Sequence, residues 1–174
     1  YEAQAEATGS ASRQDLLDEF AQVEGIEGNE DAHPLLSRVT RDAKVRQLLA
    51  APLLVCTIDH LVPATESQRG GRQIAPMLRL MSSDLVLDEP DDFDLGDLPA
   101  LGRLVHWAGL LGSRVLLSSA TLAPALVQGL FEAYLAGRRE YVKNRGAQPG
   151  SAAPPAVCCL WLDEHDQRHS DCAN

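Results

Sequence analysis

The sequence predicts an α/β fold built on a parallel sheet. Short apolar runs with the length and composition of buried strands occur at 53–58, 83–89, 114–120 and 156–162. Stretches with helical periodicity precede or separate them, at 34–49, 73–81, 98–111 and 124–144. Buried strands that alternate with helices form βαβ units, in which consecutive strands run parallel. We therefore expect strands that are covered on both faces.

Length and composition are those of an ordinary globular domain. The chain has 174 residues, of which 45% are hydrophobic and 23% charged, so wholesale disorder is excluded. No apolar run is long enough to cross a bilayer. The first residue is Tyr1 rather than Met, and we expect a segment of a longer protein. The four cysteines match no zinc or CxxC spacing, which favours free thiols in a reducing, cytoplasmic compartment.

Composition shifts divide the chain into four parts. Residues 1–34 form an acidic, flexible segment with one helix, expected from Ser12 to Val23. Residues 35–144 hold the alternating helices and first three strands. A linker rich in Gly, Pro and Ala occupies 145–155, and 156–174 hold one more strand and a truncated end.

The net charge of −10 is unevenly distributed. Residues 1–31 carry nine acids and one base, and residues 81–100 carry seven acids and no base. Residues 101–150 carry six bases and two acids. Because local potential governs contact with phosphates, the overall charge does not exclude nucleic-acid binding. It does argue against a histone-like coating of DNA. The acidic charge of 1–31 has no assigned role.

Polar residues follow three of the apolar runs. Asp88 to Asp91 follow the second run, Ser119 to Thr121 follow the third, and Thr57 to Asp59 close the first. In parallel α/β sheets, ligands bind at the carboxyl ends of the strands. The sequence therefore predicts that these groups gather at one rim of the sheet.

The adjacent carboxylates of Asp88 and Glu89 suit a metal-bound nucleotide. Their mutual repulsion is relieved by Mg²⁺, which typically binds one or two protein carboxylates and the phosphates of a nucleotide. Asp88 would then hold the metal, and Glu89 would act as the base on an attacking water. Taken alone, the pair is explained more simply by a helix N-cap or a solvated turn. Likewise, Ser119 to Thr121 suit a small-residue strand end that lets a helix pack closely.

The sequences of these motifs resemble those of a known protein family. DEPD at 88–91 and SAT at 119–121 resemble motifs II (DEAD/DEAH-box type) and III of superfamily 2 helicases, and TID at 57–59 resembles their nucleic-acid-contacting motif. The surrounding sequence, LLVCTIDHLVPATESQRGGRQIAPMLRLMSSDLVLDEPDDFDL, resembles the CRISPR-associated helicase–nuclease of type I systems, in its type I-F form. The resemblance covers about residues 35–174. It implies a RecA-like fold of the P-loop NTPase type, with residues 35–144 as the second half of the first such domain.

The resemblance implies a role for each rim residue. Asp88 would coordinate Mg²⁺ and ATP, and Glu89 would activate the hydrolytic water. Asp91 would exchange hydrogen bonds with Ser119 and Thr121, so that the nucleotide state is coupled to movement on DNA.

It also implies contacts with DNA. Thr57 and Asp59 would lie near a single strand, with the Thr57 hydroxyl reaching a phosphate. Arg69 and Arg72, in a glycine-containing loop, would follow the phosphate backbone, although a solvated turn fits this loop equally well. Ala123 stands where relatives often have a second proline, which leaves open whether the turn after SAT is weakened.

Two expected parts of such an enzyme do not occur in the sequence. The chain contains no G-x-x-x-x-G-K-[ST] phosphate loop and no histidine–aspartate nuclease cluster. We expect these, the nuclease metal and the second RecA-like domain in other parts of the parent protein. The segment alone is therefore expected not to hydrolyse ATP.

The function implied is ATP-dependent translocation on single-stranded DNA, linked to a nuclease that degrades foreign DNA in type I CRISPR interference. Implied partners are single-stranded DNA, the RNA-guided surveillance complex, the adaptation integrase and inhibitory phage proteins. One alternative is a non-catalytic α/β module that binds proteins through the acidic surface at 81–97. Another is a stand-alone phosphohydrolase with a metal on Asp88 and Asp91.

Overall fold

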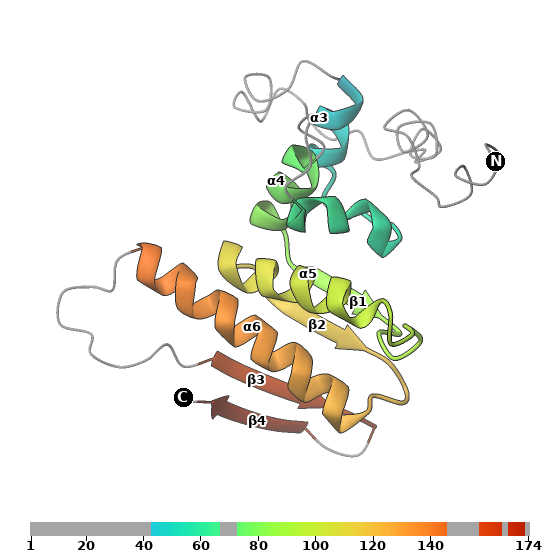
Figure 1. Ribbon diagram of the computed structural model, residues 1–174, viewed down its shortest axis with the longest axis vertical. Coiled ribbons are helices and arrows are strands. Elements are labelled where there is room, and N and C mark those ends of the chain that lie inside the picture. The colour runs from blue at the N-terminus through green and yellow to red at the C-terminus, as the bar shows by residue number, and fades with distance from the viewer. Residues whose placement is uncertain (1–42, 67–72, 146–156, 165–166, 173–174) are drawn as a thin grey trace, which may run out of the picture. The chain divides into compact units, whose positions relative to one another are not determined.

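The computed structural model describes residues 43–66, 73–145, 157–164 and 167–172 (Figure 1). The chain divides into two compact units, Tyr1–Leu78 and Arg79–Asn174, and each is described by itself. Several predicted features lie outside the described residues. These are the helix at 12–23, the acidic segment 1–34, the linker after Arg145, and Arg69 and Arg72.

The regular structure in the described part of the first unit is helical. Helix α3 (Ala43–Ala50) coincides with the second half of the helix predicted at 34–49. Two short 3₁₀ turns follow, at Ile58–His60 and Val62–Thr65. Helix α4 (Ile74–Ser82) then begins in this unit, as predicted for 73–81, and ends in the second unit.

The strand predicted at 53–58 is wrong for the described part of the chain. Residues 53–57 are irregular, and a 3₁₀ turn starts at Ile58. Leu53 and Val55 are 69% and 80% exposed, while Leu54 and Cys56 between them are partly covered. A strand exists only when a neighbour satisfies its backbone groups, and within the described residues none pairs with this run. An apolar run therefore did not suffice to predict a strand.

The second unit contains the predicted βαβ arrangement. Strand β1 (Leu85–Asp88), helix α5 (Leu98–Leu111) and strand β2 (Val115–Ser118) follow one another, and the two strands pair in parallel. Helix α5 matches its predicted bounds because both ends carry clear signals. Pro99 stands in the first turn, and Gly112 adopts a left-handed φ of 90° at the C-cap.

The core of the second unit lies along α5. Leu101, Leu104, Val105 and Ala108, which follow one helical face, are almost fully buried. Burial of each of the larger side chains contributes about 1.5–3 kcal/mol. Leu85 and Leu87 of β1 are also buried.

One face of the β1–β2 pair is open in the described part of the chain. Val86 and its parallel partner Leu116 are 58% and 55% exposed. The expectation that both strands are covered on both faces is therefore wrong here. Only the Leu85 and Leu87 side of β1 is buried in the described structure, so each strand alternates between covered and exposed residues.

Helix α6 (Pro124–Arg145) confirms the helix predicted at 124–144 and packs against α5. The two helices run side by side in Figure 1. A Cβ atom on Gly109 of α5 would collide with the backbone carbonyl of Tyr134, and one on Gly137 of α6 would collide with that of His106. The two backbones therefore touch with no side chain between them.

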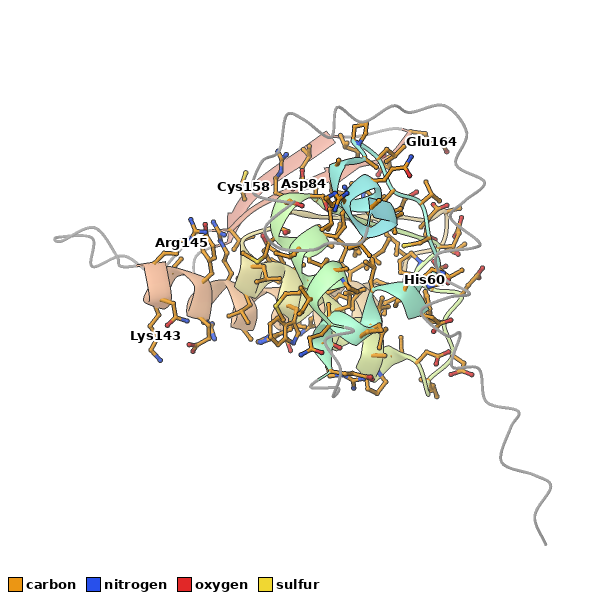
Figure 2. The ribbon with its side chains drawn as sticks, turned by 90° about the horizontal axis from the view of Figure 1, so that it is seen from above. His60, Asp84, Lys143, Arg145, Cys158 and Glu164 are labelled. Atoms are coloured by element: carbon orange, nitrogen blue, oxygen red, sulfur yellow. The ribbon has the colours of Figure 1, made fainter. Side chains whose placement is uncertain are left out.

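The basic end of α6 faces solvent. Lys143 and Arg145 lie in its last turn (labelled in Figure 2), where positive charge is favoured by the helix dipole. The guanidiniums of Arg138 and Arg145 stack on the ring of Tyr141, 4.4 and 5.0 Å from its centroid. Because Lys143 and Arg145 are exposed, this end of α6 is a solvated, positively charged surface.

Ser113 joins three elements of the second unit. Its buried hydroxyl donates to the Leu80 carbonyl, which belongs to the last turn of α4. Its own carbonyl accepts a hydrogen bond of 3.0 Å from the Tyr134 hydroxyl of α6. Burial raises the pKa of Tyr134. The start of β2 is thus tied to both helices.

The run at 156–162 forms a strand, but not in the parallel sheet. Strand β3 (Val157–Leu162) pairs antiparallel with β4 (Gln167–Cys172) in a separate two-stranded sheet. The four residues between them are too few for a parallel crossover, so the chain returns as a hairpin. Leu160 and Leu162 are exposed, which contradicts a strand buried on both faces. None of the helices in the described ranges is both long and apolar enough to span a membrane.

Replacement of Gly137 by Ala is expected to destabilise the 174-residue chain by about 1–3 kcal/mol, because the added methyl group forces the α5 and α6 backbones apart. Replacement of Gly129 on the same helix is the matched control, since a Cβ there meets nothing within 4 Å. It should stabilise the chain by up to about 1 kcal/mol through helix propensity. Urea unfolding of both variants tests the contact, and equal effects would contradict it.

Candidate functional site

The carboxyl ends of β1 and β2 meet at one rim. The last pair in register is Asp88 with Ser118. Parallel partners point to the same face, and the Ser118 hydroxyl donates to Asp88 Oδ1 at 3.0 Å. Both side chains are exposed. In the residues that the structure describes, Ser118 is the one hydrogen-bond partner of this carboxylate, and no hydrogen bond is made to Asp88 Oδ2.

Glu89 adopts an unusual backbone conformation directly after β1. Its φ is 48°, and it is the one described non-glycine residue with a positive φ. Its N–H donates to the Ser118 carbonyl at 2.7 Å, and its carbonyl accepts from Asp92 N–H at 3.1 Å. A left-handed non-glycine residue costs about 1–3 kcal/mol and tends to persist at functional sites. The buried ring of Pro90 follows it and anchors the turn.

Asp91 binds the segment that follows β2. The Thr121 hydroxyl donates to Asp91 Oδ2 at 2.5 Å, and the Thr121 N–H donates to Ser119 Oγ at 3.0 Å. The hydroxyls of Ser119 and Thr121 hold the pKa of Asp91 below its usual value. The other oxygen, Asp91 Oδ1, is buried and has no hydrogen-bond partner among the described residues.

The rim therefore brings together all five residues that were predicted around the nucleotide: Asp88, Glu89, Asp91, Ser119 and Thr121. Of the hydrogen bonds predicted between Asp91 and SAT, the one with Thr121 is present, while the Ser119 hydroxyl accepts from the Thr121 N–H. Alanine at 123 is compatible with the start of α6, because its carbonyl accepts from Val127 N–H at 3.1 Å and the helix begins at Pro124.

The residues at the rim fit a metal that is brought by a nucleotide. Mg²⁺ keeps several waters and needs one or two protein carboxylates, and Asp88 offers an exposed carboxylate oriented by Ser118. In the described ranges there is no group of three or more His, Cys, Asp or Glu side chains that could hold a metal alone. A divalent ion at this rim would take its remaining ligands from water or phosphate.

Thr57 and Asp59, the predicted DNA-contacting residues, belong to the first unit. Both are exposed, and Thr57 precedes the 3₁₀ turn that contains Asp59. The Thr57 side chain makes no capping hydrogen bond to this turn.

No protein-family model matches the chain. Two curated proteins, however, match nearly all of it. Both are named "CRISPR-associated nuclease/helicase Cas3 subtype I-F/YPEST". The protein from Pseudomonas aeruginosa is 60% identical over 165 residues, and that from Pectobacterium atrosepticum is 57% identical over 162. This chain is similar to one segment of the Cas3 subtype I-F proteins.

The matches cover 95% and 93% of this chain but only 15% and 14% of the two Cas3 relatives. The chain thus spans about one seventh of the curated relatives it matches. The resemblance inferred from DEPD, SAT and TID is confirmed at the level of this Cas3 family. The roles of individual residues remain proposals.

Ser118 is the residue at the rim that sequence reasoning missed. It precedes the SAT motif that the resemblance singled out, and its importance depends on pairing with Asp88 thirty positions earlier. The weak signal in the sequence was a hydroxyl directly after the apolar residues 115–117 of the predicted strand 114–120.

An Asp91→Asn substitution is expected to destabilise the chain at neutral pH and less so in acid. The folded-state pKa of Asp91 lies below its ordinary value of 3.8. Its carboxylate therefore contributes stability above that value, and the contribution is lost as pH falls through the folded-state pKa. Urea unfolding from about pH 7 to about pH 3 measures the difference from wild type. Asp92→Asn, at an exposed neighbour, is the charge-matched control, and a difference independent of pH would contradict the prediction.

A Glu89→Gly substitution is expected to leave the folded chain as stable as wild type, or more stable by about 1 kcal/mol, because glycine adopts a positive φ without strain. Asp92→Gly is the control, since Asp92 has no positive φ. It should lose about 0.4–1 kcal/mol through the added freedom of the unfolded chain. Thermal unfolding compares the two, and an equal loss would show that Glu89 is unstrained.

Proposed function

We propose that this chain supplies the hydrolytic carboxylates and the coupling motif of an ATP-dependent single-stranded-DNA translocase that carries a linked nuclease. The observation that carries the proposal is the rim itself. The carboxylate of Asp88 at the end of β1, those of Glu89 and Asp91 just after it, and two hydroxyls after β2 lie there, and Asp91 is hydrogen-bonded to Thr121. The names of the Cas3 relatives, nuclease/helicase, support the same reading.

Asp88 is proposed to hold Mg²⁺ that arrives with ATP, directly or through a water. When bound, the ion neutralises charge on the phosphates and makes the terminal phosphorus open to attack. Asp88 has an exposed carboxylate for this role, and the Ser118 hydroxyl occupies one side of it.

Glu89 is proposed to orient and deprotonate the attacking water. Its side chain is exposed, and hydrogen bonds of its own N–H and carbonyl define its backbone position. A base held in this way contributes about 10²–10⁴-fold to a rate, provided that the water lies within hydrogen-bond reach.

Asp91, Ser119 and Thr121 are proposed to couple the nucleotide to movement. Thr121 lies three residues before α6, so a change in its hydrogen bond to Asp91 reaches the start of that helix. The acidic loop before α5 starts from the same turn. A rearrangement at the rim would thus act on both helices.

DNA and protein partners belong to the proposal as well. Thr57 and Asp59, with Arg69 and Arg72, are proposed to contact single-stranded DNA. The RNA-guided surveillance complex and the adaptation integrase are proposed as protein partners of the parent enzyme, and phage inhibitors as further ones. The phosphate loop and the nuclease metal site are proposed to lie in the parent protein outside this segment.

The binding-module alternative is not favoured. Identity of 57–60% to segments of proteins named nuclease/helicase argues for a catalytic parent. Within the acidic surface, Asp94 is also engaged in its own loop, where Oδ1 accepts from Gly96 and Asp97 N–H at 2.7 and 3.2 Å. This carboxylate serves the turn before α5.

A Glu89→Gln substitution in the full-length protein is expected to reduce DNA-stimulated ATP hydrolysis by about 100-fold or more, with ATP binding retained. The amide keeps the shape of the side chain but does not accept the proton. Asp92→Asn, which removes a nearby exposed carboxylate outside the proposed machinery, should hydrolyse ATP at the wild-type rate. Hydrolysis unchanged in Glu89→Gln would overturn the proposed function.

A further inference from the structure

Ser118 contacts the two candidate catalytic residues, Asp88 and Glu89, through different atoms. Its side-chain hydroxyl donates to Asp88 Oδ1 at 3.0 Å. Its main-chain carbonyl accepts from Glu89 N–H at 2.7 Å. One residue at the end of β2 is therefore bonded to both residues at the end of β1.

The ladder register makes these contacts possible. Ser118 is the parallel partner of Asp88, so the two side chains leave the sheet on the same face. Since a serine hydroxyl donates a single hydrogen bond, its use on Oδ1 leaves Oδ2 to bind a ligand. The same pairing brings the Ser118 carbonyl to the residue where the chain turns left-handed.

Ser118 differs in this respect from the two hydroxyl residues that follow it. Thr121 donates its hydroxyl to Asp91, and the Ser119 hydroxyl accepts from the Thr121 N–H. The side-chain hydrogen bond of Ser118, in contrast, is made to Asp88. The hydroxyls of the two neighbouring serines thus have different partners: that of Ser118 bonds to Asp88, and that of Ser119 to the Thr121 N–H.

We infer that Ser118 is a positioning residue for the nucleotide-bound metal: its hydroxyl orients Asp88, while its carbonyl holds the turn at Glu89. This inference rests on the proposed function of the rim. It assigns to Ser118 the hydrogen bond that partners of metal-ligating carboxylates commonly supply.

Orientation, rather than stability, is the expected contribution of the hydroxyl. Both Asp88 and Ser118 are exposed, so water replaces the lost hydrogen bond in the folded protein at little cost. Replacement by alanine also leaves the Ser118 carbonyl and the ladder in place. The effect should therefore appear in metal binding and not in thermal unfolding.

The test uses the full-length protein with Ser118→Ala, Ser118→Thr and Ser82→Ala. Threonine keeps the hydroxyl and suits a strand. Ser82→Ala is the matched control, because it removes an exposed hydroxyl that bonds only within its own helix, to the Arg79 carbonyl. Two readouts are compared: the Mg²⁺ concentration that half-saturates ATP hydrolysis, and Mn²⁺ binding to the complex with a non-hydrolysable ATP analogue, followed by electron paramagnetic resonance.

Ser118→Ala is expected to raise the half-saturating Mg²⁺ concentration and the dissociation constant for Mn²⁺ by about tenfold each. Ser118→Thr should restore them to near the wild-type values, and Ser82→Ala should leave them unchanged. The thermal midpoint should stay the same in all three variants.

Metal affinity unchanged in Ser118→Ala would overturn the inference. So would a lowered thermal midpoint that accounts for the loss, or a failure of threonine to restore binding. The Glu89→Gln variant, measured in the same experiment, distinguishes a failure of the proposed function from a failure of the role inferred for Ser118. If that variant hydrolyses ATP normally, the proposed function fails; if it is inactive while Ser118→Ala binds metal normally, only the role of Ser118 fails.

Discussion

The parallel ladder between β1 and β2 is the constraint on which the rest of the second unit depends. Four residue pairs, from Leu85 with Val115 to Asp88 with Ser118, define it. A shift of one residue would move every side chain to the other face of the sheet. It would bury the polar ends and separate Asp88 from its partner. The register thus determines both the core and the rim.

At each end of this short ladder, a side-chain hydrogen bond connects the two strand segments. Before the strands begin, the Asp84 carboxylate (Figure 2) accepts hydrogen bonds from the Arg114 guanidinium and from its backbone N–H. These contacts lower the pKa of Asp84. Because the pair is exposed, it contributes more to the choice of register than to stability. At the other end, Ser118 and Asp88 form the matching contact.

The sequence correctly predicted those elements whose ends and periodicity are marked by local residues. Helix α5 has proline in its first turn and glycine at its end, and its apolar residues repeat at helical spacing, so its bounds were found without error. Features that depend on a neighbour were harder to predict. The run at 53–58 is apolar enough for a strand, yet it pairs with nothing in the described structure, and β3 pairs with β4 instead of with the parallel sheet.

In the candidate site, too, features encoded within one motif were predicted, and features that depend on a neighbouring strand were not. Motif spacing identified Asp88, Glu89, Asp91, Ser119 and Thr121, because each motif is continuous in sequence. The left-handed backbone of Glu89 and the role of Ser118 were not predicted, since both depend on how two strands thirty residues apart are aligned.

The direct backbone contact between α5 and α6 has a mechanical consequence. At Gly109 and Gly137 no side chain separates the helices, so one helix can slide past the other only if this contact breaks. The pair should therefore behave as one rigid body. Any swing of that body has to be absorbed by the segments at its ends, which include residues 89–97 before α5 and 119–123 before α6. Both hinges are then part of the rim, and the residues proposed to sense the nucleotide would also be those that bend.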